Sequence, residues 1–252
     1  MKKKLVVSII VLIALATLIA STVEKPVCIM KSYSHSYYLS DSFFRKTLKQ
    51  VSNLNNETVI ISNEVAEVLH CDYGPIVYKD TSDVLQVSFG YENFPLGKST
   101  LNFVEGSLVF YTDFTGTSRV FNPLYNEHID LPEGKIIAHA NPFIGTLFTI
   151  EQPSDHVDLY AFIPNGDWKL EQLADNAKLV TPLHDNTEVF AWLNDSTLSV
   201  IIDYMDAPEI ISTSCQDATS TYDGTIITFT DESGTHTIDY YSLMNQFVSQ
   251  NR

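Results

Sequence analysis

A change of pattern at about residue 72 constrains the fold of this chain more than any other feature. From there on, the apolar runs are five to eight residues long and rich in Val, Ile, Phe, Tyr and Thr. Turn-forming pairs such as Glu105-Gly106, Asn194-Asp195 and Asp223-Gly224 separate them. Short runs of β-branched and aromatic residues between tight turns are typical of antiparallel hairpins. The sequence therefore predicts a mainly β domain over residues 72–252.

One hairpin pattern occurs twice with the same spacing. Residues 106–117 read GSLVFYTDFTGT and residues 224–235 read GTIITFTDESGT, with five of the twelve positions identical. In both, an aspartate (Asp113 or Asp231) can accept hydrogen bonds from the turn backbone, and a later glycine can adopt a positive φ. Weaker copies begin at residues 74, 145 and 196. The mean interval of about 38 residues is typical of propeller blades, which favours a repeat over convergence on the same turn chemistry.

The order aspartate, glycine, β-run, Thr-Asp, turn glycine, β-run resembles the blade repeat of TolB-type β-propellers over residues 72–243. The residues that carry it best are Asp223, Gly224, Ile227, Phe229, Thr230, Asp231, Gly234, Ile238 and Tyr240, and Asp72 and Gly74 match in part. Tyr222 stands where a proline usually precedes the Asp-Gly pair, and the copy at residue 196 lacks both glycines. The resemblance implies a β-propeller-like domain of about five units that binds protein partners. A β-sandwich is the alternative.

Residues 1–21 are predicted to be a signal peptide or a membrane anchor. A basic start, MKKK, precedes Leu5–Ala20, an uncharged apolar run of 16 residues. Both kinds of segment begin in this way, and a spanning helix needs about 20 residues. Small residues near Ala20 favour export with cleavage. In either case the positive-inside rule places the rest of the chain outside the cytoplasm, as a periplasmic, extracellular or anchored protein.

Residues 22–71 are predicted to form a lead-in segment with a short N-terminal helix. Apolar residues recur at helical spacing in Ser40–Asn53, and Asn63–His70 is a second short candidate. Farther along, helix is expected only in Leu170–Ala177 and after Ser242.

The three cysteines are Cys28, Cys71 and Cys215. In an oxidising compartment two of them can pair, and we expect the pair to be Cys28 and Cys71 because they flank the predicted helix. The alternative is that all three are small buried hydrophobic residues. Their spacing fits no zinc-site pattern.

Charge limits the classes of partner. The formal net charge is −16 and the pI is about 4.6. Such a surface repels phosphate backbones and anionic headgroups, which excludes nucleic acid as an expected partner. It suits a cationic partner or serves solubility. Membrane contact is expected only through Leu5–Ala20, if that segment is not cleaved.

No catalytic motif stands out, and we assign no catalytic residue, cofactor or metal. The chain has no G-x-S-x-G, Walker, G-x-G-x-x-G or H-E-x-x-H pattern. The candidate catalytic carboxylates are Asp113, Asp203 and Asp231, which lie at or near strand ends. They are considered because some five-bladed propellers are glycosidases that use three carboxylates. Turn hydrogen bonding explains Asp113 and Asp231 better. His139, inside an apolar run, is expected to be a core histidine.

Aromatic residues offer a second route to binding. Tyr33, Tyr37 and Tyr38 lie just after the apolar run and either meet a membrane or partner or cover the β domain. Trp168 and Trp192 are expected in the core.

The sequence thus favours a binding protein over an enzyme: an exported or membrane-tethered envelope protein that acts as a protein-interaction module. The alternative is a carbohydrate-active enzyme or a lectin-like propeller that uses acidic and aromatic residues. A tethered accessory subunit is a third possibility if Leu5–Ala20 is retained.

Overall fold

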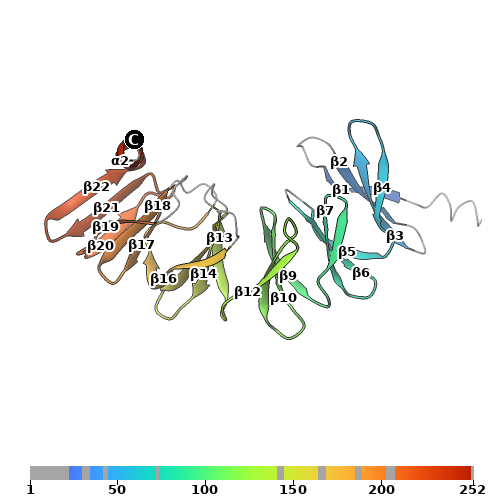
Figure 1. The fold of residues 1–252 in the computed structure, drawn as a ribbon, viewed down its shortest axis with the longest axis horizontal. Coiled ribbons are helices and arrows are strands. Elements are labelled where there is room, and N and C mark those ends of the chain that lie inside the picture. Colours follow the sequence, from blue (N-terminus) through green and yellow to red (C-terminus); the bar gives the residue numbers. More distant parts are fainter. Residues whose placement is uncertain are drawn as a thin grey trace, which may run out of the picture. The chain divides into compact units, whose positions relative to one another are not determined.

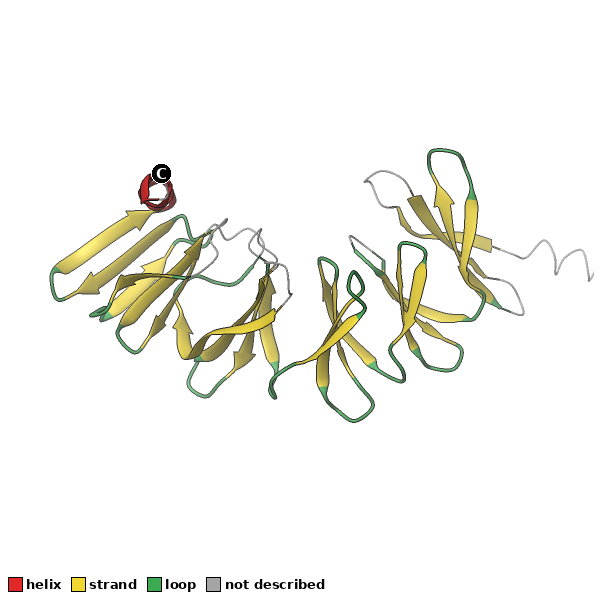
Figure 2. Cartoon of the chain, in the orientation of Figure 1, coloured by secondary structure: helices red, strands yellow, loops and turns green. Residues whose placement is uncertain are grey.

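A computed structural model of the chain describes residues 23–29, 35–41, 45–71, 74–140, 145–163, 169–184, 189–202 and 208–250. The described residues are mainly β, as predicted, and α2 (Tyr240–Gln250) is the one helix among them (Figure 1 and Figure 2). The chain divides into two compact units, Met1–Leu131 and Pro132–Arg252.

The first unit contains three four-stranded antiparallel sheets that follow one another along the chain. In each sheet the strands pair in the order of the sequence, so every connection is a hairpin. The strands are β1 (Val23–Ile29), β2 (His35–Asp41), β3 (Lys46–Ser52) and β4 (Thr58–Ser62); β5 (Val65–His70), β6 (Ile76–Asp80), β7 (Leu85–Phe89) and β8 (Glu92–Pro95); β9 (Thr100–Glu105), β10 (Leu108–Thr112), β11 (Ser118–Asn122) and β12 (Glu127–Asp130).

Apolar side chains join neighbouring sheets of this unit face to face. Leu48 of β3 is fully buried against Val65, Ile76 and Tyr78 of the second sheet. A larger cluster joins the second sheet to the third, and its buried members are Val77, Leu85, Val87, Leu96, Val109, Tyr111 and Phe121. The middle strands are therefore covered on both faces, which explains their unbroken apolar runs.

The second unit contains a seven-stranded sheet and a three-stranded sheet, both antiparallel and again in chain order. The strands are β13 (Ile136–Ala140), β14 (Thr146–Glu151), β15 (Val157–Ile163), β16 (Lys169–Leu179), β17 (Val189–Asn194), β18 (Thr197–Ile202) and β19 (Glu209–Ser212); then β20 (Asp217–Ser220), β21 (Ile226–Asp231) and β22 (Gly234–Asp239). The strand β16 pairs with β15 along most of its length and with β17 only through Lys178 and Leu179.

Two apolar clusters form the core of this unit. The first folds the β13–β16 part of the long sheet against β17 and β18, and it contains Trp192, which is 2% exposed. The prediction that Trp192 is a core residue is confirmed. The second cluster joins β17 and β18 to β21 and α2 through Val200, Phe229 and Leu243.

The repeated hairpins are closed by aspartate turns, as the sequence predicts. The Oδ1 atom of Asp113 accepts the backbone N–H of Thr115 at 2.8 Å and that of Thr117 at 3.1 Å. Asp231 Oδ1 accepts the N–H of Ser233 at 2.9 Å. The turn glycine Gly116 has a φ of 89°. Side-chain acceptors of this kind replace backbone partners that a tight turn leaves unpaired.

A polar pair across each of three hairpins is a further repeated feature. Gln86 donates to Asp80 at 2.9 Å, and Gln152 donates to Asp158 at 2.8 Å. The third pair is ionic: Arg119 Nε lies 3.4 Å from Asp113. In all three the partners are six residues apart, one at or just after the end of the first strand and the other on the second strand of the hairpin. The hairpins thus repeat in structure where their sequences have diverged.

The predicted helix in Ser40–Asn53 is wrong. This stretch forms the end of β2 and all of β3, which pair over seven residues from His35↔Ser52 to Asp41↔Lys46. Leu48 and Gln50, two residues apart on β3, are both buried. Strands on both sides of β3 satisfy its backbone, and this pairing outweighs a local spacing that also suits a helix.

Two other predicted helices are also strands. Asn63–His70 contains β5, and Leu170–Ala177 lies within β16. In β16 the buried residues Ala174 and Ala177 are three apart, a helix-like interval, because irregularities in the β15–β16 pairing interrupt the two-residue alternation. The helix expected after Ser242 is confirmed by α2.

Two glycines that begin copies of the hairpin meet in the first unit. Gly74 has a φ of +116°, and a Cβ atom placed on it would overlap the carbonyl oxygen of Gly106. The second and third sheets therefore approach each other backbone to backbone at this point. Only glycine allows both the φ value and the contact.

We expect Gly74→Ala to destabilise the protein by about 3 kcal/mol or more, because backbone strain and overlap add together. Gly90→Ala is the matched control: Gly90 also has a positive φ, +62°, but has open space around it. It should cost about 1–2 kcal/mol. Urea unfolding followed by far-ultraviolet circular dichroism measures both, because both tryptophans lie in the second unit and would not report on the first. Equal losses would contradict the close approach.

Cys71 is disulfide-bonded, and Cys215 is a buried free thiol. The pairing of Cys71 with Cys28 stays a prediction, because the Cys28 side chain is outside the description. We expect a proteolytic digest under non-reducing conditions to contain a peptide that joins residues 28 and 71. Cys215 should react with an alkylating reagent only after unfolding. A disulfide to Cys215 would contradict this pairing.

Candidate functional site

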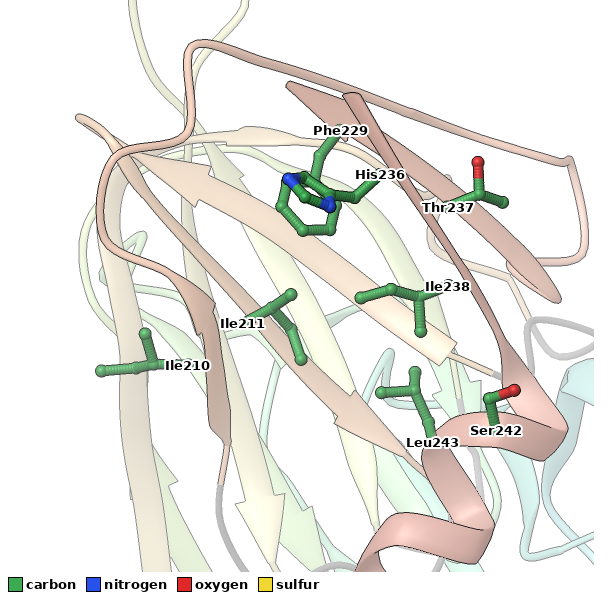
Figure 3. Close-up of a pocket in the computed structure, with 8 residues that line it drawn as sticks. All are labelled: Ile210, Ile211, Phe229, His236, Thr237, Ile238, Ser242 and Leu243. Atoms are coloured by element: carbon green, nitrogen blue, oxygen red, sulfur yellow. The ribbon is translucent and has the colours of Figure 1, made fainter. Parts of the chain in front are cut away.

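The candidate site is a groove of about 400 Å³ on the second unit, which we call the β19–β22 groove (Figure 3). Ile211 of β19, Ile238 of β22 and Leu243 of α2 point toward one another across it, beside the overlapping rings of Phe229 and His236. The remaining lining residues are Ile210, Thr237 and Ser242. Its floor is therefore apolar, while its borders are strands and a helix start.

The groove lies beside two sheet edges. The strand β19 is the last in its sheet, and β22 is the last in the three-stranded sheet. Residues 224–235 copy residues 106–117, so β21 and β22 correspond to β10 and β11, the second and third strands of a four-stranded sheet. The fourth strand of that sheet is β12. No described strand takes the equivalent place beside β22.

A serine, a histidine and an aspartate meet at the hairpin tip next to the groove. Ser233 Oγ lies 2.7 Å from His236 Nε2 and donates to Asp231 Oδ1 at 2.6 Å. The same His236 Nε2 lies 3.1 Å from Asp231 Oδ1. A nucleophilic triad needs the serine and the carboxylate on opposite ring nitrogens, so that the histidine passes a proton between them. Here both contact one nitrogen, and the cluster braces the turn.

Asp231 also connects the hairpin to β19. The Ser212 hydroxyl donates to its Oδ2 at 3.2 Å. The ring of His236 stacks on Phe229, with centroids 5.1 Å apart. These contacts hold β19 and β22 at the two sides of the groove before any ligand arrives, which lowers the entropy lost on binding.

Hydrogen bonds lower the pKa of two turn carboxylates in this region. A hydrogen bond from the Ser233 hydroxyl is the main cause that lowers the pKa of Asp231 to about 2. Asp223, in the preceding turn, has its pKa lowered to about 2, chiefly by the Thr221 hydroxyl. A carboxylate that ionises so readily is a poor general acid near neutral pH.

Charge around the groove is one-sided. Residues 179–251 contain eleven Asp and Glu residues and no Lys or Arg, although the whole chain has 15 basic residues. Near the groove the acidic residues are Glu209, Asp231, Glu232 and Asp239. The sequence prediction used only the total charge. The distribution along the chain was the signal that could have located the acidic surface.

The structure does not bring the three candidate carboxylates into one described site. Asp113 closes the β10–β11 turn of the first unit, and Asp231 closes the β21–β22 turn of the second. Asp203 lies outside the described residues. His139 is half-buried in β13 opposite Phe148. Turn hydrogen bonding therefore accounts for Asp113 and Asp231, as predicted.

Two of the three tyrosines that follow the N-terminal apolar run lie within the described residues. Tyr37 packs beside the Leu48 cluster, and burial raises its pKa. Tyr38 is half-buried on β2. Tyr33 and Trp168 are outside the described residues.

No described helix has the length and apolar character needed to cross a membrane. Within the same residues, no group of three His, Cys, Asp or Glu side chains could hold a metal ion.

Comparisons with known proteins give only distant likeness. No protein-family model matches the chain, and no curated protein matches its sequence. Among solved structures, PorZ, a surface component of the type-IX secretion system of Porphyromonas gingivalis, is 13% identical with a TM-score of 0.36. That match covers 86% of this chain and 33% of PorZ, so the chain spans about a third of that protein.

Two further structures are similar at the same level. An uncharacterized protein of Listeria monocytogenes is 8% identical over 86% of this chain and 70% of its own, with a TM-score of 0.40. Oligogalacturonate lyase of Vibrio parahaemolyticus is 9% identical over 81% and 74%, with a TM-score of 0.35. TM-scores this low do not support assigning the function of any of these proteins to this chain.

We expect Ser233→Ala to raise the pKa of Asp231 from about 2 toward 3.8, because the variant loses the main hydrogen bond to that carboxylate. The folded pKa lies below the unfolded value of about 3.9, so the turn loses stability as the pH falls from about 4 to 2. The Ser233→Ala variant should lose less stability than the parent protein over that pH interval. Carboxyl-carbon NMR titration measures the pKa, and acid unfolding measures the stability.

Thr221→Ala is the matched control for this titration. It removes a hydrogen bond from Asp223 and should raise that pKa while the pKa of Asp231 stays at about 2. A common shift of both carboxylates in either variant would show a general change of the surface and contradict the local cause.

Proposed function

We propose that this chain is an exported or membrane-tethered envelope protein that acts as a protein-interaction module. The observation that carries the proposal is the β19–β22 groove, which has buried apolar side chains at its floor and mostly polar groups at its exposed rim. It lies beside strand edges that no described strand covers, in a part of the chain that contains no Lys or Arg. An apolar floor with a charged rim is the ordinary anatomy of a protein-binding surface. The proposed partner is a protein with a basic surface, because opposite charge speeds and orients association.

The location outside the cytoplasm rests on two supports. The basic start followed by Leu5–Ala20 has the order of an export signal or an anchor. The disulfide bond of Cys71 suits an oxidising compartment, since cytosolic thiols are kept reduced.

We further propose that the sheets are blade-like units of a β-propeller. Antiparallel strands in chain order, packed face to face through apolar clusters, are what propeller blades require. Two stacked sheets of a β-sandwich are the alternative, and a backbone structure of the two units held together would distinguish them.

A carbohydrate-binding or carbohydrate-active protein is the second candidate. The ring of Tyr222 is 74% exposed and stacks on His184, with centroids 4.3 Å apart. The Nε2 atom of His184 lies 3.0 Å from the Tyr222 carbonyl oxygen, which holds the two rings in place. A braced, exposed aromatic face of this kind suits the apolar face of a sugar ring.

Photo-crosslinking tests the interaction module against the carbohydrate protein. A benzoylphenylalanine is placed at Tyr91, Phe114 or Ile210, each of which is more than half exposed. After irradiation of cells, we expect one discrete protein adduct from at least one position, and none without irradiation. The absence of adducts at all three positions, together with polysaccharide binding that Tyr222→Ala abolishes, would favour the second candidate instead.

A further inference from the structure

We infer that the β19–β22 groove receives an extended, basic segment of a partner protein, which adds to the sheet as an antiparallel strand beside β22. The inference rests on the proposed interaction function and names its site and the chemistry of the partner. It depends on the backbone of β22, the apolar floor beside it and the charge of the surrounding chain.

The backbone of β22 has hydrogen-bonding groups that point away from its sheet. Tyr240 donates its N–H to Thr225 at 2.8 Å, which makes this pair a hydrogen-bonded one. In an antiparallel ladder such pairs alternate with non-bonded ones. By that alternation, the backbone N–H and C=O groups of His236 and Ile238 bond to β21. The N–H and C=O groups of Thr235 and Thr237 therefore point outward, away from the sheet.

The repeat within the chain indicates what covers such an edge. The third strand β11 is covered by β12, which pairs with it from Arg119↔Asp130 to Asn122↔Glu127. Because β22 corresponds to β11, the occupant that fits its outer edge is an antiparallel strand. Strand addition of this kind gains affinity from main-chain hydrogen bonds and specificity from alternate side chains.

The two faces of the added strand would meet different surroundings. His236 and Ile238 face the groove with Ile211 and Leu243, so alternate side chains of the added strand would be apolar. The side chains of Thr235 and Thr237 lie on the opposite face of β22 and are exposed. Thr237 lines the groove, but its side chain points away from Ile211, Ile238 and Leu243 (Figure 3). Side chains on that side would be polar.

The charge of the segment follows from the chain around the groove. Since no Lys or Arg occurs between residues 179 and 251, Asp231, Glu232 and Asp239 have no Lys or Arg near them in sequence, and His236 is the one basic side chain that contacts Asp231 among the described contacts. Lys or Arg residues on the added strand would complement them. A second copy of this acidic surface would be repelled, which argues against self-pairing of β22.

The test uses the full exported chain and a fluorescent peptide of alternating lysine and valine, KVKVKVK. We expect binding by fluorescence anisotropy that weakens with salt. Hydrogen exchange should show fast amides at Thr235 and Thr237 in the free protein and slow ones in the complex. A peptide with N-methyl groups on the backbone amides of its lysines, the residues that would face Thr235 and Thr237, keeps the charge but cannot pair, and should bind at least about tenfold more weakly.

Two substitutions at one position separate the backbone from the side chain. Thr237→Pro removes an outward N–H and should weaken peptide binding by about tenfold. Thr237→Val keeps the N–H and the strand propensity and should bind as the parent does. If Thr237→Pro fails to fold, the exchange of the parent protein still decides the matter.

Several results would overturn the inference. Peptide binding without slowed exchange at Thr235 and Thr237 would mean general electrostatic attraction. Slow exchange at these amides before the peptide is added would mean that the edge is already covered. If the protection rises with protein concentration, a second copy covers it; otherwise the chain itself does. Crosslinked adducts at Tyr91 or Phe114 without peptide binding would support the interaction module but overturn strand addition. The absence of both adducts and peptide binding would contradict the proposed function as well as the inference.

Discussion

Burial of the inner strands on both faces is the constraint on which the rest of this structure depends. The strands β6, β10, β14 and β18 are largely buried, and none of them alternates between buried and exposed residues. A strand in that position needs an apolar sheet on each side, so one sheet cannot be stable alone. Within each unit, packing of neighbouring sheets face to face follows from this requirement.

Turn chemistry allows this stacking without exposing backbone groups. The carboxylates of Asp80, Asp113 and Asp231 each accept backbone N–H groups of the hairpin that they begin. Their low pKa values and their acceptor role have the same cause, since hydrogen bonds that hold the turn also favour the ionised carboxylate. The acidity that first suggests catalysis is therefore a property of turns.

The candidate site shows how far sequence patterns reach. The copy at residues 224–235 led to the correct hairpin and to the role of Asp231, because turn residues act over a few positions. The groove depends on Ile211 meeting Ile238 and Leu243, which lie far from it in the chain, and they meet only through the packing of β19 beside β22 and α2. The predicted helices in Ser40–Asn53 and Leu170–Ala177 failed for a related reason: pairing partners and an irregular strand register are not visible in a local pattern.

By itself, the sequence determined the mainly β class, the turn positions, the acidic surface and the export-like start, since each depends on composition or on neighbouring residues. Tertiary structure alone decided that Ser233, His236 and Asp231 brace a turn and do not form a proton relay, because that depends on which ring nitrogen faces which oxygen. It also decided that no described strand covers the outer edge of β22. Residues 234–239 read as an ordinary strand, and only their place at the end of a sheet leaves Thr235 and Thr237 with backbone groups to offer.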